Sequence, residues 1–173
     1  MLARTPKNEL SDFDRLIAQR SGRWYQACLR ITADAGLAED AVQDALLKAW
    51  HRRDQFRAGS ELDTWVHRIA INAALDLMRR DRSRFRNSES PEPSAPQAPA
   101  DERRRQEFGR DLGSALNQLT EVERVCFVLK HLEQWRLEEI AEQQSSTLGS
   151  VKQALFRALK KLRISMEPWR SEA

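Results

Sequence analysis

Apolar side chains recur at every third or fourth position along most of this chain, the spacing that places them on one face of an α-helix. In the first half this pattern predicts helices over residues 10–20, 24–31 and 37–50, and a fourth over 62–77. In the second half it predicts helices over about 105–119, 121–134, 137–143 and 148–164. Six glycines, six prolines and one tyrosine suit β-sheets poorly, whereas helix-forming residues are abundant. The expected fold is all-α.

The helical pattern stops at one stretch, SESPEPSAPQAPA, at residues 88–100. Its four prolines cannot continue a helix, and it has no large apolar side chain with which to pack. We therefore expect two small helical domains, 8–86 and 106–168, joined by a flexible Pro-rich linker over 87–105. Each domain is near the lower size limit for an independent core.

The apolar stripes predict which side of each helix is buried. In the helix over 37–50 the stripe consists of Ala38, Val42, Ala45, Leu46 and Ala49. In the helix that begins at Leu62 it consists of Leu62, Trp65, Val66, Ile69, Ala70, Ala73 and Leu77, and the opposite face carries His67, Arg68, Asn72, Asp76 and Arg79. Ser60 with Asp63, and Thr120 with Glu123, have the spacing of helix-capping pairs.

Leu47 interrupts the polar face of its helix, between acidic, amide and lysine side chains. Two interpretations remain open. The face is either a solvated surface with one stray leucine, or an interface in which a leucine is surrounded by polar groups.

The segment over 137–164 has a helix-turn-helix pattern, with a Ser-Ser-Thr turn. Its second helix has a core stripe of Val151, Leu155, Ala158 and Leu162, and Phe156 lies on the opposite face among basic and amide residues. Such a face is typical of a helix that reads DNA, where Arg and Gln address base edges and an apolar ring packs against a thymine methyl group. A solvated amphipathic helix is the alternative.

Charge is nearly balanced, with 29 Lys and Arg against 26 Asp and Glu, a formal net charge of +3. One cluster stands out, RRDRSRFR at residues 79–86, which contains five arginines. Cations are favoured at the C-terminus of a helix, and they also bind phosphates, so both roles remain open for this cluster.

Several classes of protein are excluded. No apolar run approaches the roughly 18 residues of a membrane span, and the chain starts without the apolar core of a signal peptide, so we expect a soluble, cytoplasmic protein. Cys28 and Cys126 form no CxxC pair, which favours two buried thiols over a disulfide or a zinc site. His51, His67 and His131 have no metal-ligand spacing, so neither an enzyme nor a cofactor is expected.

Three collinear segments carry a resemblance: AEDAVQDALLKAW, FRAGSELDTWVHRIAINAALDLMRR, and LTEVERVCFVLKHLEQWRLEEIAEQQSSTLGSVKQALFRALKKLR. Together they resemble the bacterial RNA polymerase sigma factors of the extracytoplasmic-function (ECF) group of the sigma-70 family. The similarity covers about residues 10–83, resembling region 2, and about 108–165, resembling region 4. It implies an alternative sigma factor that binds core RNA polymerase, directs it to minus-10 and minus-35 promoter elements, and nucleates DNA melting.

The resemblance also implies a role for each surface. Core polymerase, through its β′ clamp helices, would bind Asp40, Gln43, Asp44, Leu47 and Lys48. Minus-10 recognition and melting would involve Phe56, Arg57, Ser60, Asp63, Trp65, His67, Arg68, Asn72, Arg79 and Arg80, although for Trp65 a core role is equally open. The minus-35 element would contact Ser150, Lys152, Gln153, Phe156, Arg157 and Lys160. Further implied partners are the β flap of polymerase and an anti-sigma protein, with no membrane insertion.

Three residues depart from the family pattern: Ser145 replaces a usual Gly in the turn, and Ala154 and Leu159 replace frequent arginines. We therefore expect weaker phosphate binding by this domain, and a turn in which a non-glycine residue has to adopt positive φ. A stand-alone helix-turn-helix regulator is the alternative function, but it leaves the Leu47 surface and the FRAGSELD loop unexplained.

Overall fold

The computed structural model describes residues 6–53, 62–81 and 100–170. All regular elements within these residues are helical, as predicted, and the chain divides into two compact units, Met1–Pro91 and Glu92–Ala173. None of the described helices combines the length with the apolar character that a bilayer crossing requires.

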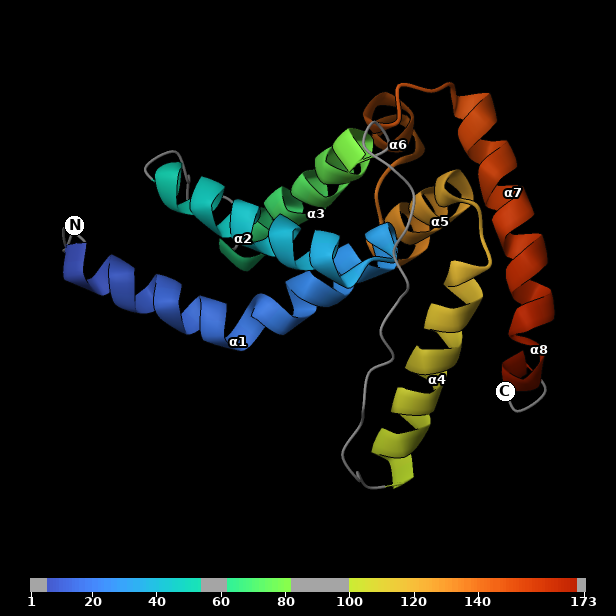
Figure 1. The fold of residues 1–173 in the computed structure, drawn as a ribbon, viewed down its shortest axis with the longest axis horizontal. Helices are drawn as coiled ribbons and strands as arrows, with labels where there is room; N and C mark the ends of the chain where they lie inside the picture. Colours follow the sequence, from blue (N-terminus) through green and yellow to red (C-terminus); the bar gives the residue numbers. More distant parts are fainter. Residues whose placement is uncertain (1–5, 54–61, 82–99, 171–173) are drawn as a thin grey trace. The chain divides into compact units, whose positions relative to one another are not determined.

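Helices α1 (Pro6–Thr32), α2 (Ala35–His51) and α3 (Leu62–Asp81) make up the described part of the first unit, and each packs against the other two (Figure 1). The prediction of two helices over 10–20 and 24–31 was wrong, because α1 runs through both segments. Phe13 and Trp24 are buried on either side of the Ser21–Gly22 pair, and this packing outweighs the low helix propensity of glycine. The helix bends along its length (Figure 1), and a Ser-Gly pair is a common cause of such bending.

Alanines form the packed side of α2. Ala38, Ala41, Ala45 and Ala49 are its buried residues, and Ala70, Ala73 and Ala74 are buried in the adjacent helix α3. We call these seven residues the alanine seam. Small side chains at buried positions let neighbouring helices approach closely. Of the predicted stripe, Ala38, Ala45 and Ala49 are confirmed, whereas Val42 and Leu46 are only half-buried.

The buried side of α3 is turned relative to the predicted stripe. Val66, Ala70 and Ala73 are buried as expected, but Leu62, Trp65, Ile69 and Leu77 are half-buried. Their place is taken by Ile71, Ala74, Leu75 and Met78. The reason is that α3 contacts both α1 and α2, so its buried face is set by two neighbours rather than by its own largest residues.

Asp63 in the first turn of α3 is a buried carboxylate that connects this helix to α1. Trp24 donates its indole N–H to Oδ1 of Asp63 at 2.9 Å, and Arg23 donates to Oδ2 at 3.0 Å. Arg20 completes the group with an ion pair at 3.5 Å. The predicted capping partner, Ser60, lies outside the described residues.

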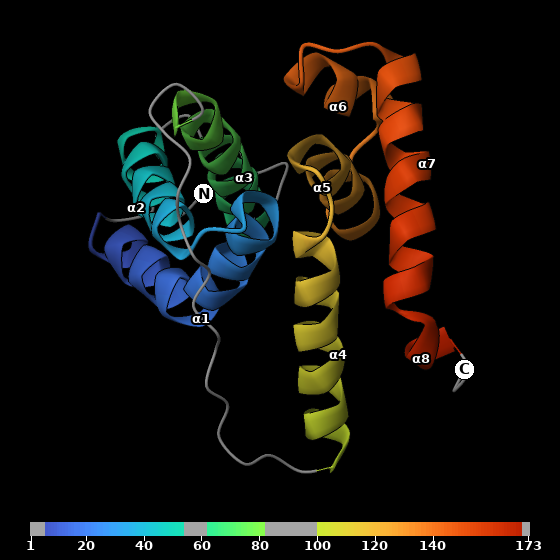
Figure 2. The same cartoon turned by 45° about the vertical axis from the view of Figure 1, so that its right-hand side comes forward.

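The second unit contains α4 (Ala100–Asn117), α5 (Glu121–Phe127), the π-helical turn η2 (Val128–Leu132), α6 (Leu137–Gln143), α7 (Leu148–Ser165) and α8 (Glu167–Arg170). Figure 2 shows α7 as a long helix beside α5 and α6, and both of these helices contact it. Two predicted boundaries need correction. Residues 100–105 are helical in α4 rather than part of a linker, and the helix predicted over 121–134 ends in a π-helical turn.

Side-chain caps fix the starts of α5 and α7. The predicted capping box is confirmed: Thr120 accepts from the amide of Glu123, and Glu123 accepts from the amide of Thr120. Thr147 caps α7 by accepting from the amide of Ser150 at 3.1 Å. In the turn before it, Ser145 has φ of 48°, which confirms the expected left-handed residue. A side chain in this conformation costs about 1–2 kcal/mol relative to glycine.

The C-terminal helix α8 is attached to α4 by Trp169. Its ring meets Phe108 edge-on at a centroid distance of 5.2 Å, and its indole N–H donates to Asp111 at 2.9 Å. Ser165 adds a hydrogen bond to Gln118. The end of α7 is therefore connected to α4 through contacts of high sequence separation.

The hydrogen bonds of Asp63 predict that the stability of the first unit depends on this carboxylate. Replacing Asp63 with Ala leaves the buried indole N–H of Trp24 without its acceptor, so we expect the free energy of unfolding to fall by about 1–3 kcal/mol. Urea unfolding of the full chain, followed by circular dichroism, measures this loss. The matched control is Asp76→Ala, which removes a partly exposed ion pair with Arg79 and should cost less than about 1 kcal/mol. Equal losses in the two variants would contradict a structural role for Asp63.

Candidate functional site

The residues predicted to bind a protein partner share the outer face of α2. Asp40, Gln43 and Leu47 are exposed and lie opposite the alanine seam, whereas Asp44 and Lys48 are half-buried at the flank of the same face. Leu47 is 60% exposed, and Asp44 and Lys48 form an ion pair at 2.7 Å. An exposed leucine surrounded by polar side chains has the composition of a small protein-binding centre with a polar rim.

The outer face of α3 brings together part of the predicted melting site. Trp65, Arg68, Asn72 and Arg79 follow one another at helical spacing and are all exposed or half-buried. Asp76 lies among them and forms an ion pair with Arg79 at 3.2 Å. Trp65 therefore belongs to this accessible face rather than to the fully buried core. Arg80 is exposed at the adjoining edge of the helix.

Two residues predicted for the same site lie elsewhere on α3. His67 was grouped with Arg68, but it shares its helix face with the buried residues Asp63, Ala70 and Ala74, so it lies on the packed side. Asp63 is engaged by Trp24 and two arginines within the unit. Three further predicted residues, Phe56, Arg57 and Ser60, lie outside the described residues.

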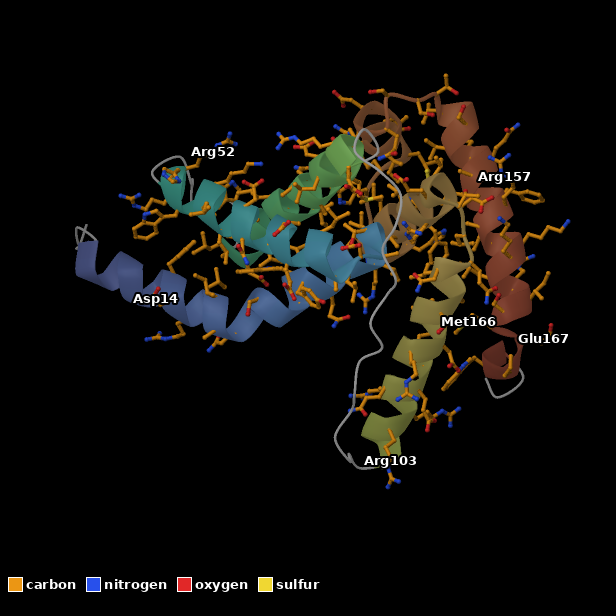
Figure 3. All side chains as sticks on the ribbon, viewed as in Figure 1. Asp14, Arg52, Arg103, Arg157, Met166 and Glu167 are labelled. Atoms are coloured by element: carbon orange, nitrogen blue, oxygen red, sulfur yellow. The ribbon has the colours of Figure 1, made fainter. Side chains whose placement is uncertain are left out.

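The outer face of α7 contains all six residues predicted to read DNA, and all of them are exposed: Ser150, Lys152, Gln153, Phe156, Arg157 and Lys160. Phe156 is 71% exposed, and the predicted core stripe on the opposite side is buried. Figure 3 labels Arg157 on this helix. Ala154 is fully buried, so the residue at this position does not contribute to the exposed face.

A buried glutamate, Glu123 of α5, connects the capping box to α7. Lys161 donates to its Oε2 at 2.7 Å, and the Nε of Arg157 lies 3.5 Å from its Oε1. Burial by itself raises the pKa of Glu123, but the hydrogen bonds from Lys161 and Thr120, together with the charge of Lys161, outweigh it and hold the pKa below its usual value. Glu123 is therefore ionised at neutral pH.

Sequence reasoning found the capping role of Glu123 but missed its contacts with α7. Those partners lie 34 and 38 residues further along the chain, and no local pattern connects them to a capping glutamate. A second missed feature is Ile164, which is exposed and shares the outer face of α7 with Arg157 and Lys160. The 3.6-residue repeat of the helix was the signal that could have revealed it.

The described residues include both cysteines and several side chains of the types that bind metals. No group of three or more His, Cys, Asp or Glu side chains in this part of the chain is arranged to hold a metal ion. Both cysteines are buried thiols, and burial raises the pKa of Cys126 to about 11. Because the thiolate is the reactive form, this thiol is poorly nucleophilic at neutral pH.

Comparison with known proteins assigns a family to each unit. Residues 16–84 match the family described as Sigma-70 region 2, and residues 109–162 match the family described as Sigma-70, region 4. The chain is 30% identical over 151 residues to the ECF RNA polymerase sigma factor SigL of Mycobacterium tuberculosis, covering 83% of this chain and 82% of SigL. It is 29% identical over 159 residues to SigE of Mycolicibacterium smegmatis, covering 89% of this chain and 61% of SigE.

Two solved structures have a similar fold. One is the sigma factor RpoE from Bartonella quintana, crystallised with the anti-sigma factor NepR, with a TM-score of 0.60 and 24% identity over 90% of this chain and 97% of RpoE. The other is CnrH in complex with the cytosolic domain of CnrY, with a TM-score of 0.51 and 25% identity over 90% of this chain and 88% of CnrH. At 24% identity the first likeness is one of fold alone.

The lowered pKa of Glu123 predicts a pH dependence of stability. An acid whose pKa is lower in the folded state stabilises the fold above its unfolded pKa, and this contribution is lost as the pH falls through the folded pKa. Between about pH 6 and pH 3 the free energy of unfolding should therefore fall more steeply for the wild type than for Glu123→Gln. Urea unfolding at a series of pH values measures both slopes. Glu138→Gln, at an exposed position on α6, controls for the loss of one carboxylate. If the free energy of unfolding depends on pH as steeply in Glu123→Gln as in the wild type, the prediction is refuted.

Proposed function

Because this chain belongs to the extracytoplasmic-function group of the sigma-70 family of RNA polymerase sigma factors, we propose that it binds core RNA polymerase and directs it to promoters. It reads a minus-35 element with its second unit, reads a minus-10 element with its first unit, and nucleates melting there. The observation that carries the proposal is a pair of exposed apolar side chains, Leu47 and Phe156, each set among polar residues on a helix of the matched regions. A stand-alone DNA-binding regulator leaves the Leu47 surface without a role.

Core polymerase binds the outer face of α2 in this proposal. The alanine seam holds the opposite side of the helix, so Leu47 and its neighbours are presented on a fixed support. Burial of a leucine in a partner pocket supplies affinity, while the polar residues around it exclude water and select a complementary partner. The partner surface is the pair of β′ clamp helices, as the family resemblance implies, and the β flap is the expected partner of the second unit.

The outer face of α3 takes part in minus-10 recognition. Trp65 offers a ring for stacking an unpaired base, and Arg68 and Asn72 offer hydrogen-bond donors beside it. Arg79 and Arg80, at the end of the same helix, bind phosphates of the DNA strand. Asp63 positions this helix through Trp24 rather than contacting DNA itself. Base unstacking costs a few kcal/mol, and these contacts offset it without a catalytic step.

In the minus-35 element, α7 enters the major groove. Gln153 and Arg157 can hydrogen-bond base edges, and Phe156 can pack on a thymine methyl group. Ser150, Lys152 and Lys160 flank them and suit phosphate or base contacts. The small net charge of +3 suggests that polymerase supplies much of the affinity for DNA.

Regulation by an anti-sigma protein is part of the proposal. The family resemblance implies such a partner, and CnrH, which has a similar fold and is 25% identical to this chain, was solved with another bound protein, the cytosolic domain of CnrY. Two small units with separate partner surfaces allow an inhibitor to cover both without disrupting a shared core. We place this activity in the cytoplasm, where core polymerase and promoter DNA are found.

Replacement of Leu47 with Asp tests the polymerase surface. A charge in the centre of the interface should weaken binding to core polymerase by about 1–2 kcal/mol or more, which is about tenfold or more. Because Leu47 is largely exposed, the circular dichroism spectrum and thermal unfolding should stay unchanged. Titration of labelled sigma variant with core polymerase measures the affinity.

The matched control for Leu47 is Ala18→Asp, which places the same charge at an exposed apolar residue of α1, in the same unit but away from the outer face of α2. It should bind core polymerase as the wild type does. If the wild type fails to bind core polymerase that other sigma factors bind, the proposed function itself is wrong.

Replacement of Arg157 with Gln tests base reading by α7. If Arg157 makes a bidentate contact with a base, the variant should lose about 1–3 kcal/mol of affinity for the preferred promoter and much less for random duplex. Arg163→Gln removes an equal charge from the last turn of the same helix and should weaken both duplexes alike. Competition binding of the reconstituted holoenzyme measures the two losses. Equal losses for Arg157→Gln would identify a phosphate contact instead.

A further inference from the structure

Glu123 connects the cap of one helix, α5, to the exposed face of another, α7. Its side chain is 4% exposed, so its charge has to be satisfied by neighbouring groups. The two carboxylate oxygens have different partners. Oε2 accepts from the amide of Thr120 at 3.0 Å and from Lys161 at 2.7 Å, whereas Oε1 faces Arg157. A helix cap alone would require only the first of these contacts.

The ion pair with Arg157 leaves the DNA-reading part of the guanidinium available. The guanidinium approaches Glu123 through Nε, at 3.5 Å, while the arginine side chain as a whole remains 58% exposed. The terminal amino groups of arginine are those that contact the O6 and N7 atoms of guanine. The attraction between Nε and this carboxylate favours rotamers that keep the guanidinium beside Glu123 before DNA binds, so less conformational entropy is lost on binding.

Glu123 also lowers the positive charge of the same face. Arg157 and Lys161 are both paired with this carboxylate, so they attract phosphates less strongly than two unpaired cations would. Attraction to phosphates is the same for every sequence, whereas base contacts are not. A carboxylate at this position therefore reduces the attraction to phosphates of every DNA sequence. At the same time it favours the orientation of Arg157 that is required to read one particular base.

We propose that Glu123 is a positioning residue that determines promoter specificity, by holding Arg157 in a base-reading orientation and by limiting phosphate attraction at the α7 face. This inference rests on the proposed reading of DNA by α7. It assigns a sequence-reading role to a residue of α5, which lies outside the recognition helix itself. A purely structural cap would stabilise α5 but would not affect which bases are selected.

Selection from a randomised duplex library tests the proposal, with the full chain assembled on core polymerase. Four proteins are compared: wild type, Glu123→Gln, Arg157→Gln and Lys161→Gln. Glutamine can still accept from the amide of Thr120, so Glu123→Gln retains the cap while removing the charge. Lys161→Gln is the matched control, because it breaks the other ion pair of Glu123 and leaves Arg157 in place.

The proposal predicts that Glu123→Gln loses base preference at the same positions as Arg157→Gln and nowhere else. Affinity for the selected sequence, relative to a shuffled duplex of equal composition, should fall about tenfold. Binding to the shuffled duplex should become more salt-dependent, with a slope in log salt steeper by about 1, because a neutralising charge is gone. Lys161→Gln should retain the base preferences of the wild type.

Three outcomes overturn an assignment. Unchanged base preferences in Glu123→Gln exclude the specificity role. That role is also excluded if Glu123→Gln and Lys161→Gln both lose preference at all positions and both have lower thermal stability, because this result indicates structural support alone. If the wild type selects no upstream sequence at all, the proposed reading of DNA by α7 fails, and the inference about Glu123 fails with it.

Discussion

A carboxylate that is removed from water must be bonded to donors in a defined geometry, and this requirement shapes both units of the chain. In the first unit Asp63 connects α3 to α1 through Trp24. In the second unit Glu123 connects α5 to α7 through Lys161. Apolar contacts tolerate a small rotation or sliding of a helix, whereas a buried carboxylate with short hydrogen bonds does not. Each helix proposed to meet DNA is therefore fixed in rotation as well as in position.

These two carboxylates matter more because each unit is small. Units of this size bury limited apolar area, so a few well-placed polar bonds make up a large share of what selects one arrangement. The C-terminal contact of Trp169 with Phe108 and Asp111 has the same character, because it joins elements that are far apart in the sequence. The arrangement of the helices that carry the partner surfaces therefore depends on contacts with residues far away in the sequence.

Much of this organisation was predictable where the determining residues are close in the sequence. The capping box of Thr120 and Glu123 and the core stripe of α7 were predicted correctly, because their parts lie within one or a few turns. The buried face of α3 was not, since packing against both α1 and α2 turned it away from Trp65 and toward Met78. His67 was misplaced for the same reason. The contacts of Asp63 and Glu123 with other helices span 34 to 43 residues, and periodicity holds no information about such pairs.

The alanine seam has a consequence for how proteins of this kind diverge. Because the fully buried residues of α2 are all alanines, its inward side leaves little room for larger residues, while its outward side contributes little to the core. Substitutions around Leu47 can then alter affinity for a shared enzyme with small effects on folding. A duplicated gene could be adjusted step by step to compete more or less strongly for the same limited pool of enzyme, without first acquiring compensating changes in the core.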